Sequence, residues 1–214
     1  SKKGEFFMGK SIAIFNQKGG VGKTTTNVNL SASIGKLGKK VLVLDMDPQG
    51  NTTSGYGIDK NTIENTIYEV IVDGLDIHDA IIKTDFDNIY LVAAASELAG
   101  AEIELANEKD REYKLKNSLD KIKDDYDYIF IDCPPSLGML TINSLTASDS
   151  VLIPIQCEYY ALEGVSQLMS TFKLVKKRLN PNIEIQGVVL SMFDGRANLS
   201  IQVVEEVKKY FKGS

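Results

Sequence analysis

The chain has 214 residues and a formal net charge of −5, with 43% hydrophobic and 25% charged residues. This composition is typical of a globular domain with a hydrophobic core, and the acidic balance excludes a protein that binds nucleic acid through its overall charge. No apolar run approaches the roughly 20 residues needed to cross a bilayer, and the N-terminus does not resemble a signal peptide, so we expect a cytoplasmic protein with no membrane partner.

Short apolar runs alternate with amphipathic stretches along the chain. The predicted strands, rich in β-branched residues and apolar on both faces, are 11–16, 41–45, 89–93, 128–132, 150–154 and 185–191. The predicted helices are one that follows the first strand and ends at Gly38, then 64–73, 98–106, 111–123, 139–147, 159–179 and 197–211. This alternation predicts a single α/β domain, a mostly parallel sheet between two layers of helices.

The domain is expected to begin at Met8, the natural start, so that residues 1–7 form a leader and the final Gly-Ser is also foreign to the fold. The single histidine, His78, is expected to be a surface or packing residue. Cys133 and Cys157 belong to no CxxC motif or Cys/His cluster, and we expect both to be reduced thiols.

A glycine-rich loop, "NQKGGVGKTTTNVNL" (16–30), follows the first strand and opens a helix. Its glycines let backbone N–H groups approach phosphate oxygens, and the helix N-terminus adds a favourable dipole. Lys23 is predicted to reach the β and γ phosphates of a nucleotide, and the Thr24 hydroxyl to bind Mg²⁺. The predicted nucleotide-binding residues are Lys18, Gly19, Gly20, Val21, Gly22, Lys23, Thr24 and Thr25.

Lys18 stands where the usual phosphate loop has its first glycine. Because its side chain leaves the loop early, it is poorly placed to fold back onto the phosphates of its own loop. We therefore predict that it reaches a nucleotide held by a facing subunit, where it would offset charge that develops in phosphoryl transfer. The alternative is a solvated loop lysine.

Carboxylates end two of the predicted strands. Asp132 ends "YIFID" and is predicted to hold Mg²⁺ through a water, the alternative being a cap of the strand. Asp45 and Asp47 follow "VLVL", and Asp45 is expected to support the metal shell and the loop.

Three longer stretches carry a resemblance. The loop "KGGVGKTT" is similar to the deviant Walker A box of the ParA/MinD group. Together with it, three stretches resemble the ParA/Soj partition ATPases: "VLVLDMDPQGNTTSGYG" (41–57), "YDYIFIDCPPSLGMLTINSLTASDSVLIPIQCEYYALEGVSQL" (126–168) and "SMFDGRANLSIQVVEEVKKYF" (191–211). The resemblance implies a P-loop NTPase fold and slow, partner-stimulated hydrolysis of ATP with Mg²⁺. It also implies an ATP-bound sandwich homodimer, a ParB-like centromere-binding partner and a bacterial nucleoid location.

The same resemblance assigns roles to single residues. Asp47 aligns with the aspartate that orients or activates the attacking water, whereas the alternative is a turn residue before Pro48. Lys18, Lys23 and Asp47 are thus the predicted catalytic residues. The segment from Pro134 to Gly138 resembles a switch that senses the γ-phosphate; the alternative is a plain turn.

DNA binding would require a local basic patch. Arg196 matches an arginine implicated in DNA binding in the family, and two helices carry basic residues at spacings of three and four, namely Lys173, Lys176, Lys177, Arg178, Lys208, Lys209 and Lys212. Solvated surface charges are the alternative for these helical residues. Binding to double-stranded DNA is expected to be non-specific in sequence and to weaken with salt.

Other functions were weighed against partition. A MinD-like membrane-associated ATPase shares the loop but adds a C-terminal amphipathic helix, a nitrogenase-iron-protein-like reductase needs cluster-binding cysteines, and an ATP-dependent ligase needs an acid-substrate pocket. Family members continue past Ser214 with a segment that supplies an adenine contact and a second arginine for DNA, and we expect the domain at 8–214 to lack that segment.

Overall fold

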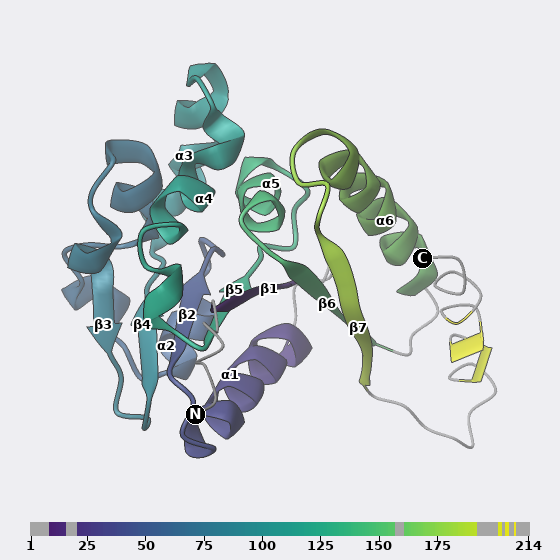
Figure 1. Ribbon diagram of the computed structural model, residues 1–214, viewed down its shortest axis with the longest axis horizontal. Coiled ribbons are helices and arrows are strands. Elements are labelled where there is room, and N and C mark those ends of the chain that lie inside the picture. Colours follow the sequence, from purple (N-terminus) through teal and green to yellow (C-terminus); the bar gives the residue numbers. More distant parts are fainter. Residues whose placement is uncertain are drawn as a thin grey trace, which may run out of the picture.

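The computed structural model describes residues 9–15, 21–156 and 161–191, together with 201, 202, 204, 205 and 208. In this part of the chain a seven-stranded sheet lies between two layers of helices (Figure 1). The strands are β1 (Lys10–Ile14), β2 (Val41–Asp45), β3 (Ile81–Lys83), β4 (Ile89–Val92), β5 (Tyr128–Asp132), β6 (Ser150–Gln156) and β7 (Glu184–Ser191). The predicted α/β fold is confirmed.

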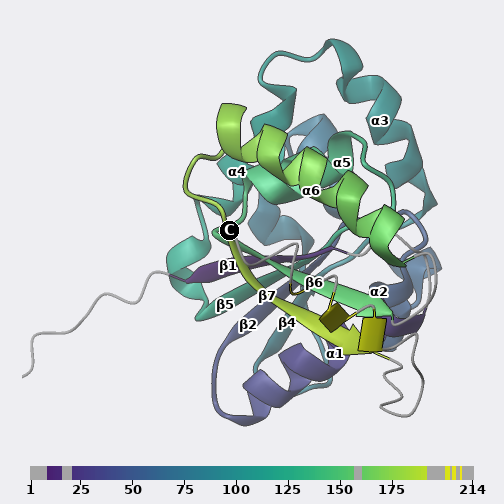
Figure 2. The ribbon, with the colours of Figure 1, turned by 90° about the vertical axis from the view of Figure 1, so that its right-hand side faces the viewer.

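The strand order is β3-β4-β2-β5-β1-β6-β7, and each pair is parallel except β3 with β4. The α-helices are α1 (Val21–Lys36), α2 (Asn51–Gly55), α3 (Ala101–Glu104), α4 (Lys114–Leu119), α5 (Met139–Thr146) and α6 (Ala161–Arg178). Figure 2 shows α1 beneath the sheet and α4, α5 and α6 above it. The carboxyl ends of the central parallel strands therefore meet at one edge, where ligands bind in such folds.

The central strands are buried on both faces, which explains their unbroken apolar sequences. In β2, Leu42 and Leu44 pack into the core on one side of the sheet, whereas Val41 and Val43 pack into the core on the other. Gly38, with φ of +81°, follows the end of α1 as predicted, because this left-handed conformation suits a residue without a side chain.

Several boundaries differ from the predictions. The antiparallel edge strand β3 and the short helix α2 were missed, because three and five residues are too short to display a period. The predicted helix 64–73 is a π-helical turn at Glu69–Asp73 preceded by two α-helical residues, and the predicted helix 98–106 is α3 flanked by 3₁₀ turns. The predicted helix 111–123 contains the six-residue α4, and most of 197–211 lies outside the described residues.

Candidate functional site

Two carboxylates end neighbouring strands at the carboxyl edge of the sheet. Asp45 of β2 and Asp132 of β5 are register partners, and their exposed fractions are 0% and 1%. The pKa of Asp45 is raised to about 7, first because the group is buried and then because the negative charge of Asp132 lies beside it. Two buried carboxylates side by side form a site of strongly negative potential, which suits a divalent cation.

Asp45 organises the loop that follows β2. One of its oxygens accepts hydrogen bonds from the backbone N–H and the hydroxyl of Thr53, at 2.8 and 2.7 Å. The other oxygen accepts the Asp47 N–H at 3.1 Å. The loop from β2 to α2 is thereby tied to the end of the strand, as expected for a residue that supports the loop.

Asp47 lies within this tied loop and is 6% exposed. Its carboxylate accepts the Gln49 N–H at 3.0 Å, and its carbonyl accepts the Gly50 N–H at 2.8 Å. Gly50 has φ of +61°, and a Cβ at this position would come within 2.9 Å of the carbonyl oxygen of Ala94. The backbone around Asp47 is therefore held in one conformation, so its carboxylate is pre-positioned rather than mobile.

Thr52 is a site residue that the sequence did not reveal. Its hydroxyl donates a 2.5 Å hydrogen bond to Oδ2 of Asp132, and it is fully buried. The contact joins α2 to β5 across 80 residues of sequence. Its only sequence signal was a pair of threonines five and six residues after Asp47, a pattern without a known role.

The strand that leads into the phosphate loop ends at the same edge of the sheet. Ile14, the last residue of β1, is the register partner of Asp132, and α1 begins at Val21. The backbones of Gly22, Lys23, Thr24 and Thr25 thus lie in the first turns of this helix. Lys18, Gly19 and Gly20 lie outside the described residues.

The segment after β5 is anchored by a second residue that the sequence analysis missed. Glu102 of α3 accepts the backbone N–H groups of Met139 and Leu140 at 2.7 and 3.2 Å. It caps the N-terminus of α5, which lacks a side-chain cap of its own at Gly138. A Cβ at Gly138 would lie too close to the Glu102 carboxylate, so a larger residue here would displace the carboxylate from this cap. The segment suggested as a switch is therefore tied at its far end to α3.

The predicted basic patch is described only in part. Lys173, Lys176, Lys177 and Arg178 are exposed near the C-terminal end of α6, and Lys208 is exposed as well. Arg196, Lys209 and Lys212 lie outside the described residues, and so does Cys157. Within the described ranges, no helix is long and apolar enough to span a bilayer.

Cys133 and His78, which we expected to have no role in the chemistry, lie among the described residues. Cys133 is buried and forms no disulfide, and its Sγ donates a hydrogen bond to the Ile131 carbonyl at 3.8 Å. His78 is exposed and lies 2.7 Å from the Asp76 carboxylate, as expected for a surface residue.

The residues at this edge fit a nucleotide with Mg²⁺. Buried carboxylate oxygens are ligands that Mg²⁺ prefers, and a helix N-terminus attracts phosphate.

Known proteins share this architecture. Residues 9–185 match the AAA domain family AAA_31, and Soj, the sporulation initiation inhibitor protein of Bacillus subtilis, is 60% identical over 96% of this chain and 81% of its own length. The chain belongs to the ParA/Soj family.

Further comparisons extend the ParA/Soj assignment. The chromosome partitioning protein ParA of Myxococcus xanthus is 52% identical, over 99% of this chain and 75% of its own length. A Mycobacterium smegmatis structure named as cobyrinic acid a,c-diamide synthase, with bound ADP and magnesium, has a TM-score of 0.90 at 39% identity and covers 95% of this chain and 83% of its own. This likeness confirms the predicted P-loop NTPase class of the ParA/Soj chain.

Proposed function

We propose that this protein is an ATP-hydrolysing switch of DNA segregation, with ATP and Mg²⁺ as its cofactors. The observation that carries the proposal is the placement of Asp45 and Asp132 side by side at the end of the sheet, beside the strand that leads into α1. The relatives named for partition, which match nearly the whole chain, support the same function.

The residues have the following roles in this proposal. Lys23 and the backbone of 19–25 bind the phosphates, and Thr24, with Asp132 acting through a water, holds Mg²⁺. The metal ion would neutralise charge on the phosphate oxygens. Asp47, held in its loop, orients the attacking water.

Lys18 acts across a homodimer. ATP binding brings two subunits face to face, and the Lys18 of each contacts the nucleotide of the other. We expect Lys18→Ala to abolish ATP-driven dimerisation in size-exclusion experiments with a non-hydrolysable ATP analogue. Asp47→Ala is the control and should still form the dimer; a normal dimer of Lys18→Ala would remove the residue from this role.

The dimer binds non-specific double-stranded DNA through Arg196 and the exposed basic end of α6, which places the protein on the nucleoid. Dimerisation doubles the basic patch, so DNA affinity depends on the bound nucleotide. A ParB-like centromere-binding protein then stimulates hydrolysis and resets the switch.

The deciding experiment measures binding to duplex DNA with ATP, with ADP and without nucleotide, at rising salt. Binding only with ATP, with affinity that falls linearly on logarithmic axes as salt rises, is the expected result. Normal ATP-driven dimers that bind no DNA would contradict the DNA switch; liposome binding would then test the MinD-like alternative, and ATP-dependent amidation of carboxylate substrates would test the ligase alternative.

A further inference from the structure

Asn27 of α1 is a fully buried polar residue whose side chain has no hydrogen-bond partner among the described residues. Its exposed fraction is 0%, and neither the carbonyl oxygen nor the nitrogen of its carboxamide makes a hydrogen bond within the described structure. A buried amide without partners is costly, because its desolvation is not compensated. Such a group indicates a ligand, ion or water that completes its hydrogen bonds.

The helix register places Asn27 near the predicted metal site. Asn27 lies three residues after Thr24, so the two residues share one side of α1. One turn later on the same side, the Ser31 hydroxyl is hydrogen-bonded to the Tyr56 hydroxyl at the end of α2. This contact shows that the side of α1 bearing Asn27 faces α2.

The start of α2 lies closer to the carboxyl edge of the sheet than this contact does. Thr52 stands four residues before Tyr56, as Asn27 stands four residues before Ser31, and its hydroxyl is bonded to Asp132 at the carboxyl end of β5. Both helices have their N-terminal ends toward this edge. Asn27 and Thr52, one turn back from Ser31 and Tyr56, therefore lie closer than those residues to the edge that bears Asp132. Both side chains are fully buried there.

We propose that Asn27 and Thr52 are positioning residues that form the outer coordination shell of Mg²⁺ at Asp132. Thr52 fixes one oxygen of the Asp132 carboxylate, and the Asn27 carboxamide supplies both a donor and an acceptor to the hydration shell of the ion. Outer-shell hydrogen bonds of this kind set ligand orientation and metal affinity. The inference rests on the nucleotide–Mg²⁺ site of the proposed function.

The test is a Mg²⁺ titration of each variant in the presence of fluorescent ADP, with the nucleotide affinity measured separately in EDTA. Asn27→Leu keeps the number and branching of the side-chain heavy atoms but removes the amide, and Thr52→Val does the same for the hydroxyl. Each should raise the half-saturating Mg²⁺ concentration by about 10-fold or more. Affinity for ADP in EDTA should stay within about twofold, because the phosphate contacts remain.

A second readout separates this role from a structural one. Without nucleotide and Mg²⁺, Asn27→Leu should melt at the same temperature as the unchanged protein or higher, since a buried unpaired amide has been removed. The double variant should lose less than the product of the two single effects, because both residues act on one ion. Ser33→Ala, on the exposed side of α1, is the matched control and should titrate normally.

If Asn27→Leu does not fold, Asn27→Ser is titrated with Mg²⁺ in its place. Unchanged Mg²⁺ half-saturation in Asn27→Ser, or in a folded Asn27→Leu, would overturn the inference while leaving the nucleotide site intact. Failure of the unchanged protein to bind ADP in a Mg²⁺-dependent manner would instead contradict the proposed function itself.

Discussion

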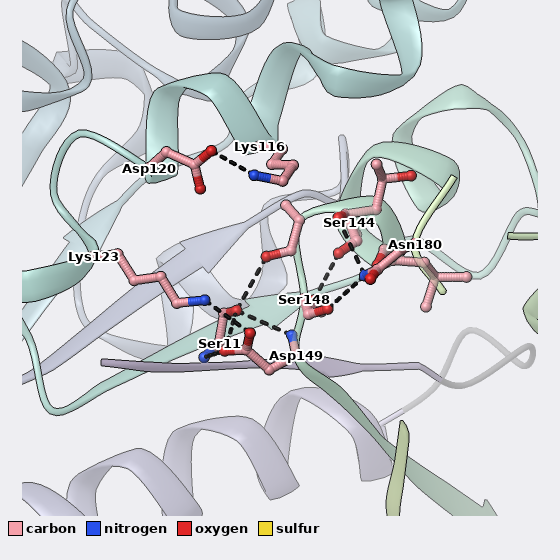
Figure 3. Close-up of polar contacts among 11 residues, drawn as sticks. Ser11, Lys116, Asp120, Lys123, Ser144, Ser148, Asp149 and Asn180 are labelled. Carbon is pink, nitrogen blue, oxygen red and sulfur yellow. Dashed lines mark hydrogen bonds and ion pairs between the residues drawn. The ribbon is translucent and has the colours of Figure 1, made fainter. Parts of the chain in front are cut away.

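The two edges of the same sheet treat carboxylates in opposite ways. At the amino edge, Asp149 accepts hydrogen bonds from the backbone N–H and hydroxyl of Ser11 at 2.8 and 2.9 Å, and from the Lys123 ammonium at 2.8 Å (Figure 3). Burial alone raises the pKa of Asp149, but the Lys123 ammonium and the Ser11 donors outweigh it, so the pKa lies below its usual value. At the carboxyl edge, Asp45 faces Asp132, and its pKa is raised to about 7.

Neighbouring groups at the amino edge are satisfied in the same manner. The Asn180 amide donates to the carbonyls of Leu145, Thr146 and Ser148, and so caps the C-terminal end of α5 (Figure 3). Asn27, near the other edge, has no such partners in the described structure. The polar groups at the amino edge are therefore paired, which favours stability. At the carboxyl edge the repulsion between Asp45 and Asp132 and the Asn27 amide, unpaired among the described residues, remain, and a bound ligand can offset these costs.

The largest expected effect is on catalysis at the carboxyl edge. Asp47→Ala should lower the rate of ATP hydrolysis by about 10²–10⁴-fold, the range typical of a residue that activates water. Nucleotide binding, measured with fluorescent ADP, should be retained, and the free energy of unfolding should change little. Undiminished hydrolysis would exclude Asp47 from the mechanism.

The opposite pattern is expected at the amino edge. Asp149→Ala leaves the Ser11 N–H and the Lys123 ammonium, whose side chain is only 18% exposed, without their acceptor. We expect a loss of about 2 kcal/mol in urea unfolding, with the hydrolysis rate per folded molecule unchanged. Asp120→Ala removes the exposed pair with Lys116 and should cost less than about 0.5 kcal/mol. Equal losses in both variants would contradict the structural importance of Asp149.

Glu102 sharpens the comparison, because it is a stabilising carboxylate at the functional edge. Glu102→Ala removes two hydrogen bonds to the N-terminus of α5 and should lower the free energy of unfolding by about 1 kcal/mol. Glu104→Ala, on the same short helix but exposed and bonded to Tyr68, is the control. A loss no greater than that of the control would show that the α5 N-terminus does not depend on Glu102.

The smallest effect concerns acid stability. Because the pKa of Asp149 is lowered on folding, its stabilisation is present above the unfolded value of 3.8 and is lost as the pH falls through the folded value. The difference in unfolding free energy between the unchanged protein and Asp149→Ala should be constant from pH 7 to 5 and shrink below about pH 4. A difference that grows on acidification would reverse the assigned sign.

Sequence patterns predicted the fold best where the signal was local and long. The runs 41–45 and 128–132 match β2 and β5 residue for residue, because strands buried on both faces are continuously apolar. The helices around α3 and α4 were predicted too long. Their sequences suit a helix, but tertiary packing breaks them into short turns, and propensity is a weak guide against packing.

The sequence by itself determined which chemical groups are available: a glycine-rich loop before a helix, and aspartates at the ends of apolar strands. These are local features, since they depend on neighbours within a few residues. Only the tertiary structure decided that Asp45 and Asp132 are adjacent, that Thr52 bonds to Asp132, and that Glu102 caps α5. Those contacts join residues 37 to 87 positions apart, and their partners are selected by strand order and helix packing, which no local pattern encodes.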